Sequence, residues 1–168
     1  MKKIITKENI KINFKTLFWF LLTFLAYYLP FCFVELSTKY YLSLKHPDFP
    51  IWLYSLGWLV STIALSLFTS IYIYKFRIKE DKENIDGYRR LFLYLFLYYL
   101  FTVVLITTFF NGNNLFLTYI LCIAIFVISL FVLMETFLIN KKDSFVLIIP
   151  ILWSVFLCVI SIILYLNN

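Results

Sequence analysis

Long apolar runs limit what this chain can fold into more than any short motif does. A helix needs about 20 apolar residues to cross the hydrocarbon core of a bilayer. Of the 168 residues, 63% are hydrophobic and 14% are charged, which leaves too little polar surface to cover a water-soluble core. Five runs reach the required length: residues 16–34, 51–74, 91–110, 115–138 and 145–166. The sequence therefore predicts an all-α integral membrane protein in which residues 1–168 form a single bundle of five transmembrane helices.

A polar tetrapeptide, NGNN at residues 111–114, separates the third run from the fourth. Asn-Gly clusters are typical of turns. The alternative is one very long helix, which would leave these amide groups in the middle of the membrane, where each unsatisfied group costs several kcal/mol. We therefore expect a tight helical hairpin at this point.

The basic residues fall mainly on one side of this five-span arrangement. They lie before the first run, between the second and third runs, and between the fourth and fifth runs, whereas only Lys39 and Lys45 lie elsewhere. Cytoplasmic loops of membrane proteins carry an excess of Lys and Arg. Four or six spans would scatter these charges over both sides. We expect the N-terminus in the cytoplasm, the C-terminus on the opposite side, and the loop 35–50 on that opposite side, where it is a candidate lid.

Several other classes of function find little support in the residues. The net charge of +6 comes from residues at the ends of the runs, where acidic side chains interleave with the basic ones, so no nucleic-acid partner is expected. The three cysteines lie inside apolar runs without CxxC spacing, which argues against a disulfide framework or a metal site. No nucleophile–base pair or glycine-rich phosphate loop is visible. We expect no required cofactor, and His46 is the sole imidazole available to ligate a haem iron.

Residues at helical spacing on three of the runs share faces rich in rings and hydroxyls. Such a lining, nearly uncharged, suits a flat apolar ligand that is gripped by ring stacking and oriented by a few hydrogen bonds. The alternative is that these Trp and Tyr residues are ordinary helix-packing side chains. The faces are Tyr54, Gly57, Trp58 and Ser61 on the second run; Tyr94, Tyr98, Thr102, Leu105 and Phe109 on the third; and Pro150, Trp153, Phe156 and Ser161 on the fifth.

The entry to the second run carries prolines and aromatic side chains close together. Pro47 stiffens the loop because proline fixes φ and restrains the residue before it. Phe49 and Trp52 then form an apolar lip for the candidate lid. The proposed ligand-binding residues are Pro47, Phe49, Trp52, Tyr54, Trp58, Ser61, Tyr98, Thr102, Trp153, Phe156 and Ser161. Gly57 and Ser61 are also a pair of small residues that lets another helix approach closely, either within the bundle or in a homodimer.

Three segments, in order on a five-span chain of this length, resemble one known family. They are KYYLSLKHPDFPIWLYSLGW at residues 39–58, FFNGNNLFL at 109–117 and LIIPILWSVF at 147–156. The family is the tryptophan-rich sensory proteins of bacteria, which are relatives of the animal translocator protein or peripheral benzodiazepine receptor. Thr102 and Leu105 stand where that family has Asn and Trp, so the chain looks like a divergent member.

The resemblance implies a location in the bacterial cell membrane and a ligand. The implied ligand is a tetrapyrrole such as protoporphyrin or haem, or, as in animal relatives, a sterol or a benzodiazepine-type drug. Trp58 and Trp153 match two tryptophans that bacterial members use in light-dependent porphyrin breakdown, which makes them the candidate catalytic residues. The leading interpretation is a binding or regulatory protein for an apolar planar molecule. The alternatives are the light-dependent porphyrin-degrading activity and a structural or accessory membrane subunit without a small-molecule ligand.

Overall fold

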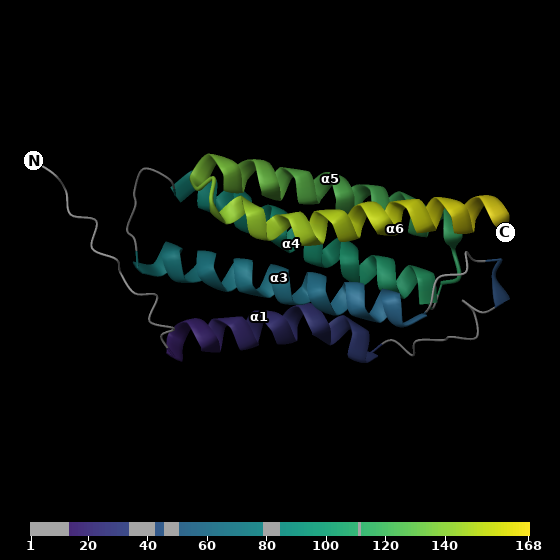
Figure 1. Cartoon of the computed structure of the whole chain (residues 1–168), viewed down its shortest axis with the longest axis horizontal. Coiled ribbons are helices and arrows are strands. Elements are labelled where there is room, and N and C mark those ends of the chain that lie inside the picture. The colour runs from purple at the N-terminus through teal and green to yellow at the C-terminus, as the bar shows by residue number, and fades with distance from the viewer. Residues whose placement is uncertain (1–13, 34–42, 46–50, 79–84, 111) are drawn as a thin grey trace, which may run out of the picture.

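The computed structural model describes residues 14–33, 43–45, 51–78, 85–110 and 112–168. Every regular element in this part of the chain is a helix. Five long helices lie side by side and run alternately in opposite directions along the long axis of the molecule (Figure 1). In chain order the elements are α1 (Phe14–Phe33), α3 (Ile51–Ile78), α4 (Ile85–Phe110), α5 (Leu115–Ile139), the short 3₁₀ helix η2 (Asp143–Leu147) and α6 (Ile148–Asn167). The predicted all-α fold is confirmed, and the number of helices agrees with the five predicted runs.

Most of the described helices have the length and apolar composition that the predicted transmembrane runs imply. Within the described residues, α3, α4, α5 and the segment from η2 through α6 are each long and apolar enough to cross a membrane, while the apolar part of α1, Thr16–Pro30, is shorter. Their outward faces carry large hydrophobic side chains, such as Phe96, Leu138 and Leu152, each about 60% exposed or more. Helix α3 ends four residues after the end of the predicted run 51–74, and α4 begins six residues before the start of the predicted run 91–110. Polar residues extend both helices beyond their apolar parts without breaking the hydrogen bonds of the helix.

The predicted hairpin between α4 and α5 is present. Helix α4 ends at Phe110, and Asn114 caps α5 by accepting a hydrogen bond of 2.9 Å from the backbone N–H of Leu117. Asn113 adopts a left-handed φ of 49°, a conformation that asparagine tolerates better than most residues. The side chains of this turn therefore both end one helix and start the next.

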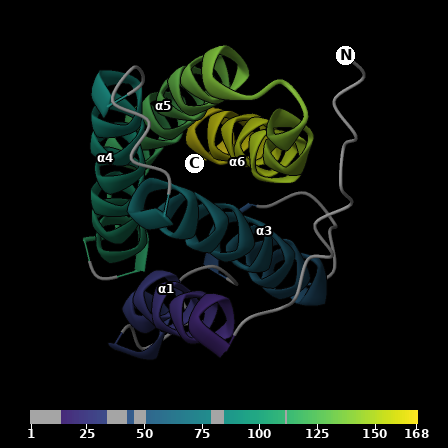
Figure 2. The ribbon, with the colours of Figure 1, turned by 90° about the vertical axis from the view of Figure 1, so that its left-hand side faces the viewer.

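The helices form a closed arrangement when viewed along the bundle. Helix α4 packs along α5, α5 along α6, α6 against α3, and α3 along α1, which also touches α4. Figure 2 shows α3 between α1 and α6, with α4 and α5 beside them. Helices α3 and α4 have almost no close backbone approach in the described residues. The space between α3 and α4 is therefore filled by side chains or left open.

The two ends of the bundle differ in charge. One end, called the basic end below, carries Lys75, Arg89, Arg90, Lys141 and Lys142. The opposite end, called the pocket end, is where α3 and α5 begin and where α1, α4 and α6 end (Figure 1). Among the described residues Lys45 is the basic residue at the pocket end.

Two ion pairs join helices at the basic end. Arg90 of α4 donates to both carboxylate oxygens of Glu135 in α5, at 2.8 and 3.3 Å, and Glu135 is only 5% exposed. Lys75 at the end of α3 pairs with Asp143 of η2, which also accepts a 3.0 Å hydrogen bond from the side chain of Asn140. A buried carboxylate is tolerated only when it is paired and hydrogen-bonded, so the pair with Arg90 explains how Glu135 can be buried.

Aromatic rings fill the space between α3 and α4 near the basic end. Tyr72 and Phe76 of α3 contact Tyr88 of α4 with ring centroids 5.9 and 5.7 Å apart, and Phe76 also meets Phe92 edge-on at 5.8 Å. Large rings are needed here because the two helix backbones lie far apart. We call these four residues the aromatic spacer.

Candidate functional site

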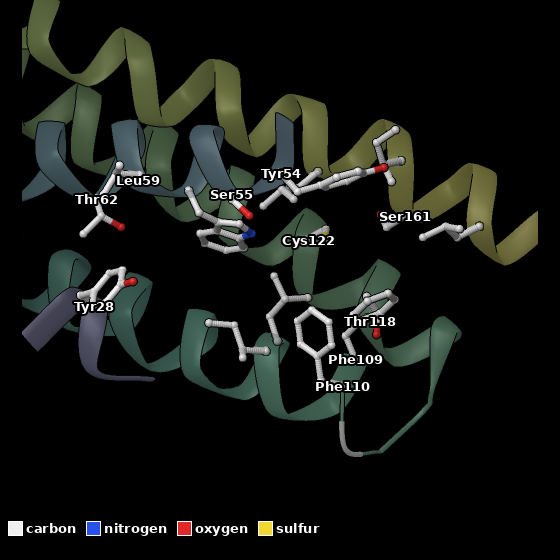
Figure 3. A pocket seen from close by; sticks show the side chains of 16 residues that line it. Tyr28, Tyr54, Ser55, Leu59, Thr62, Phe109, Phe110, Thr118, Cys122 and Ser161 are labelled. Atoms are coloured by element: carbon white, nitrogen blue, oxygen red, sulfur yellow. The ribbon is translucent and has the colours of Figure 1, made fainter. Parts of the chain in front are cut away.

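A cavity of about 280 Å³ lies between α3 and α4 at the pocket end, with α5 and α6 closing its other sides. Figure 3 shows Tyr28 and Thr62 toward one end of this cavity and Thr118 and Ser161 toward the other. Tyr54 and Ser55 of α3 lie across it from Phe109 and Phe110 of α4 (Figure 3). The lining residues are Tyr28, Tyr54, Ser55, Trp58, Leu59, Thr62, Leu105, Ile106, Phe109, Phe110, Thr118, Cys122, Leu157, Ile160, Ser161 and Leu164.

Short side chains face the cavity beside the rings of Tyr54, Trp58, Phe109 and Phe110. In the gap between the two helices, Ser55 and Thr62 of α3 line one side of the cavity, and Leu105 and Ile106 of α4 line the other. These side chains are too short to span the distance that Tyr72, Phe76 and Tyr88 cover at the basic end. Short side chains at these four positions therefore leave room that rings occupy at the basic end.

Two buried hydroxyl residues lie in the core on the side of the cavity that faces the basic end. Ser61 of α3 and Tyr98 of α4 are 2% and 3% exposed. Thr102, one turn further along α4, is also buried, and its hydroxyl donates to the Tyr98 carbonyl at 2.8 Å. These three residues belong to the closed part of the core and do not line the cavity.

The cavity offers rings and hydroxyl oxygens and, among the described residues that line it, no charged side chain. Thr118 donates its hydroxyl proton to the Asn114 carbonyl at 2.7 Å, and Ser161 donates to the Cys158 carbonyl at 3.0 Å. Since these protons are used within the helices, the two oxygens keep lone pairs that can accept hydrogen bonds. The lining therefore suits a neutral, largely apolar molecule with a small number of polar groups.

A series of aromatic contacts forms the wall between α3 and α6. Trp58 meets Trp153 edge-on with ring centroids 5.6 Å apart, Trp153 stacks on Phe156 at 5.1 Å, and Phe156 contacts Tyr54 at 5.8 Å. Of these four residues only Tyr54 and Trp58 line the cavity. Trp153, 8% exposed, and Phe156 support them from behind. Edge-on and offset ring contacts of this kind hold the rings in one orientation.

Gly57 allows this wall to form. A Cβ atom at position 57 would overlap the six-membered ring of Trp153, so the indole occupies the place of the missing side chain. Ser61, one turn later, is fully enclosed in the bundle. The small residues at positions 57 and 61 are therefore used within the bundle, where Gly57 admits α6.

The predicted ligand-binding residues fall into four groups in the structure. Tyr54, Trp58 and Ser161 line the cavity, and Trp153 and Phe156 lie directly behind its wall. Ser61, Tyr98 and Thr102 lie in the core toward the basic end. Trp52 is 62% exposed and does not line the cavity. Pro47, Phe49 and the haem-ligand candidate His46 lie outside the described residues.

The candidate lid is described only at Ser43, Leu44 and Lys45. Leu44 packs against the side chains of Ile160 and Leu164, both of which line the cavity. The backbone N–H of Lys45 donates to the side-chain oxygen of Asn168 at 2.8 Å, and the amide of Asn168 donates back to the Lys45 carbonyl at 3.1 Å. This part of the loop is thus attached to the end of α6 beside the cavity.

Several lining residues were not among the sequence candidates. Leu105 and Phe109 belong to the predicted face of the third run, so their helical spacing already indicates that they face the same way as the candidates on that run. Thr118 and Cys122, one turn apart on α5, form a small polar pair beside the predicted hairpin and show the same helical spacing. Tyr28 gives no such signal, because its contact depends on how α1 lies against the other helices.

The described residues contain no group of three or more His, Cys, Asp or Glu side chains that could hold a metal ion. No family model matches the chain, and no curated protein matches it. The likeness to the tryptophan-rich sensory proteins is therefore carried by the three sequence segments alone.

Proposed function

We propose that this chain is a multi-pass membrane protein that crosses the bacterial cell membrane five times and binds a flat apolar molecule in the cavity between α3 and α4. The membrane part of the proposal is supported by the length and apolar surface of the helices. The orientation is supported by the described basic residues, which gather at one end of the bundle; this end would face the cytoplasm.

The cavity is the single observation that carries the binding function. A cavity between the helices of a bundle, lined by rings and hydroxyl groups, is a common form of small-molecule site. It also coincides with three of the residues selected from the sequence, Tyr54, Trp58 and Ser161. The ligand would stack against the rings of Tyr54 and Trp58 and would donate hydrogen bonds to the hydroxyl oxygens.

The size of the cavity narrows the choice of ligand. Its volume of about 280 Å³ is at the lower end of the range for ligand pockets. A compact molecule of two or three rings, such as a benzodiazepine-type compound, would be held whole. A tetrapyrrole, the ligand class that the resemblance implies, would be gripped along one edge while the rest of its ring projects from the cavity. The proposed ligand class is therefore planar and apolar, with porphyrin or haem as its largest member.

The test is a titration of the purified protein with protoporphyrin IX, followed by quenching of tryptophan fluorescence. Trp58→Phe should weaken binding about three- to tenfold, since an aromatic contact contributes about 0.5–1.5 kcal/mol. Trp52→Phe is the matched control, because Trp52 lies on the same helix but outside the lining. Quenching that does not saturate, and that is the same in both variants, would instead favour a structural or accessory subunit without a small-molecule ligand.

Light-dependent porphyrin breakdown is the second candidate, and the contact between Trp58 and Trp153 favours it. Of the two tryptophans only Trp58 borders the cavity, so it would donate an electron to a photoexcited porphyrin, and Trp153 would then reduce the oxidised Trp58 with an electron of its own. Under illumination in the presence of dioxygen, the wild-type protein should then yield an altered porphyrin product that Trp153→Phe forms more slowly. Identical product formation in the two proteins would remove this candidate.

A further inference from the structure

A second concave surface lies at the basic end, on the outside of the bundle. It is a groove of about 470 Å³ formed where α5 ends and where η2 leads into α6. Most of its lining is apolar and strongly exposed: Phe145 is 66% exposed and Phe137 is 50% exposed. The lining residues are Leu130, Leu133, Met134, Phe137, Lys141, Ser144, Phe145 and Ile148.

The apolar part of the groove follows one face of α5. Leu130, Met134 and Phe137 recur at intervals of four and three residues, which places them in a row along the helix, and Lys141 lies in the turn that follows the end of α5. From Leu130 to the end of α5 at Ile139, this face of the helix is about 14 Å long at the rise of an α-helix. One leaflet of a bilayer has a hydrocarbon thickness of about 15 Å, half of the whole core. The row therefore has the length of one extended acyl chain in one leaflet.

A lysine stands where the head group of such a lipid would lie. The ammonium group of Lys141 lies 5.3 Å from the centre of the Phe137 ring, and the residue lines the groove. The nearest acid in the sequence, Asp143, is engaged by Lys75 and Asn140. Within the part of the chain that the structure describes, no ion pair joins Lys141 to a carboxylate. The groove is thus apolar along its length and positively charged at one end.

The turn that carries Lys141 is held by its own hydrogen bonds. The Ser144 hydroxyl donates to the Lys141 carbonyl at 2.6 Å, and the Lys142 backbone N–H donates to the Asn140 side chain at 3.1 Å. The position of the lysine at the end of the groove therefore does not depend on a ligand, and a partner would lose little free energy in ordering this turn.

We infer that this groove binds one anionic phospholipid, with an acyl chain along the α5 row and the phosphate at Lys141. The phosphate group would act as the anionic partner of Lys141, for which the described residues provide no carboxylate. An acyl chain would cover the exposed rings of Phe137 and Phe145. The site is separate from the cavity between α3 and α4, so it does not depend on the ligand proposed there. It rests on the proposed insertion of the helices in a bilayer, which thiol labelling at the two ends of the bundle tests independently.

The experiment is native mass spectrometry of the full chain in a neutral detergent, titrated with phosphatidylglycerol or phosphatidylcholine. The wild-type protein should retain one phosphatidylglycerol more tightly than phosphatidylcholine. Lys141→Gln should weaken the retention of phosphatidylglycerol about fivefold, the factor expected for one lysine at an anionic lipid surface. Lys142→Gln is the matched control, since it removes the same charge one residue away but outside the groove, and it should change retention less than twofold.

A second variant tests the acyl part of the site. Ile148→Trp places a large ring in the groove and should reduce the retention of both lipids. Both lysines and Ile148 are exposed, so all three variants should fold, which their thermal unfolding in the absence of lipid verifies. The inference is overturned if wild-type protein shows no preference for phosphatidylglycerol, or if the two lysine variants weaken its retention equally, because then only the general charge of this end attracts lipid.

Discussion

The indole of Trp153 lies over the backbone of Gly57, in the space that a side chain at position 57 would occupy. This contact brings α6 against α3 and places the Trp153 ring behind Trp58, which forms part of the cavity wall. Because Gly57 has no side chain, Trp153 can lie close enough to α3 to contact Trp58, although the two tryptophans are far apart in the sequence.

Gly57→Ala should destabilise the protein by about 1–3 kcal/mol, because the added methyl group forces the Trp153 ring out of a packed position. The measurement is thermal unfolding in detergent. Gly87→Ala is the matched control: a Cβ atom there lies 3.5 Å from Ile139, an ordinary contact, and the substitution should be neutral or slightly stabilising. Equal losses in the two variants would mean that the contact between Gly57 and Trp153 has no special role.

Ser55→Phe should lower the affinity for a planar ligand at least tenfold. Ser55 lines the cavity and is exposed, so a phenyl ring can enter the cavity without disturbing the core. Leu56→Phe is the control, since Leu56 is the next residue, is 48% exposed and lies outside the lining. The measurement is the protoporphyrin IX titration with each variant. Unchanged affinity in Ser55→Phe would place the ligand somewhere other than this cavity.

Arg90→Ala should lower the free energy of unfolding more than Arg89→Ala does, because it leaves the buried Glu135 carboxylate without its partner. Arg89→Ala removes an equal charge from the neighbouring residue, whose pair with Asp86 is 3.6 Å long and exposed, and should cost no more than about 1 kcal/mol. Chemical or thermal unfolding of the two variants compares them directly. A larger loss in Arg89→Ala would contradict the assignment of the buried pair to α4 and α5.

The proposed orientation predicts opposite labelling at the two ends of the bundle. In intact cells, a thiol reagent that does not cross membranes should label Lys45→Cys, whereas Lys142→Cys should react only after the cells are permeabilised. The reason is that α3, α4 and α5, three crossings, separate the two positions. Labelling of both positions from the same side would refute the three crossings, and the reverse pattern would invert the orientation.

The helices and the hairpin could be predicted from the sequence because each depends on local properties. An apolar run long enough to cross a bilayer determines a helix, and the polar cluster around Gly112 and Asn114 determines a turn between two of them. The helical faces were also predictable, since side-chain direction follows from a 3.6-residue period. This is why Tyr54, Trp58 and Ser161, which lie on predicted faces of two different runs, line the same cavity.

The depth of each residue in the site could not be predicted in the same way. Trp153 was assigned to the lining by its face, but the close approach at Gly57 places it behind Trp58. Tyr98 was assigned by the same reasoning and lies instead in the closed core with Ser61. Helical spacing indicates the direction of a side chain, whereas the distances between helices depend on the sizes of side chains from all the elements that meet there.

The aromatic spacer has a consequence for the cavity at the far end of the same two helices. Tyr72, Phe76, Tyr88 and Phe92 keep α3 and α4 apart near the basic end, and the two helices stay apart where shorter side chains leave the cavity open. We therefore expect the rings near the basic end to influence the width of the proposed binding cavity at the pocket end. A change in the bulk of these rings would tune ligand selection from a distance, without altering any atom that the ligand touches.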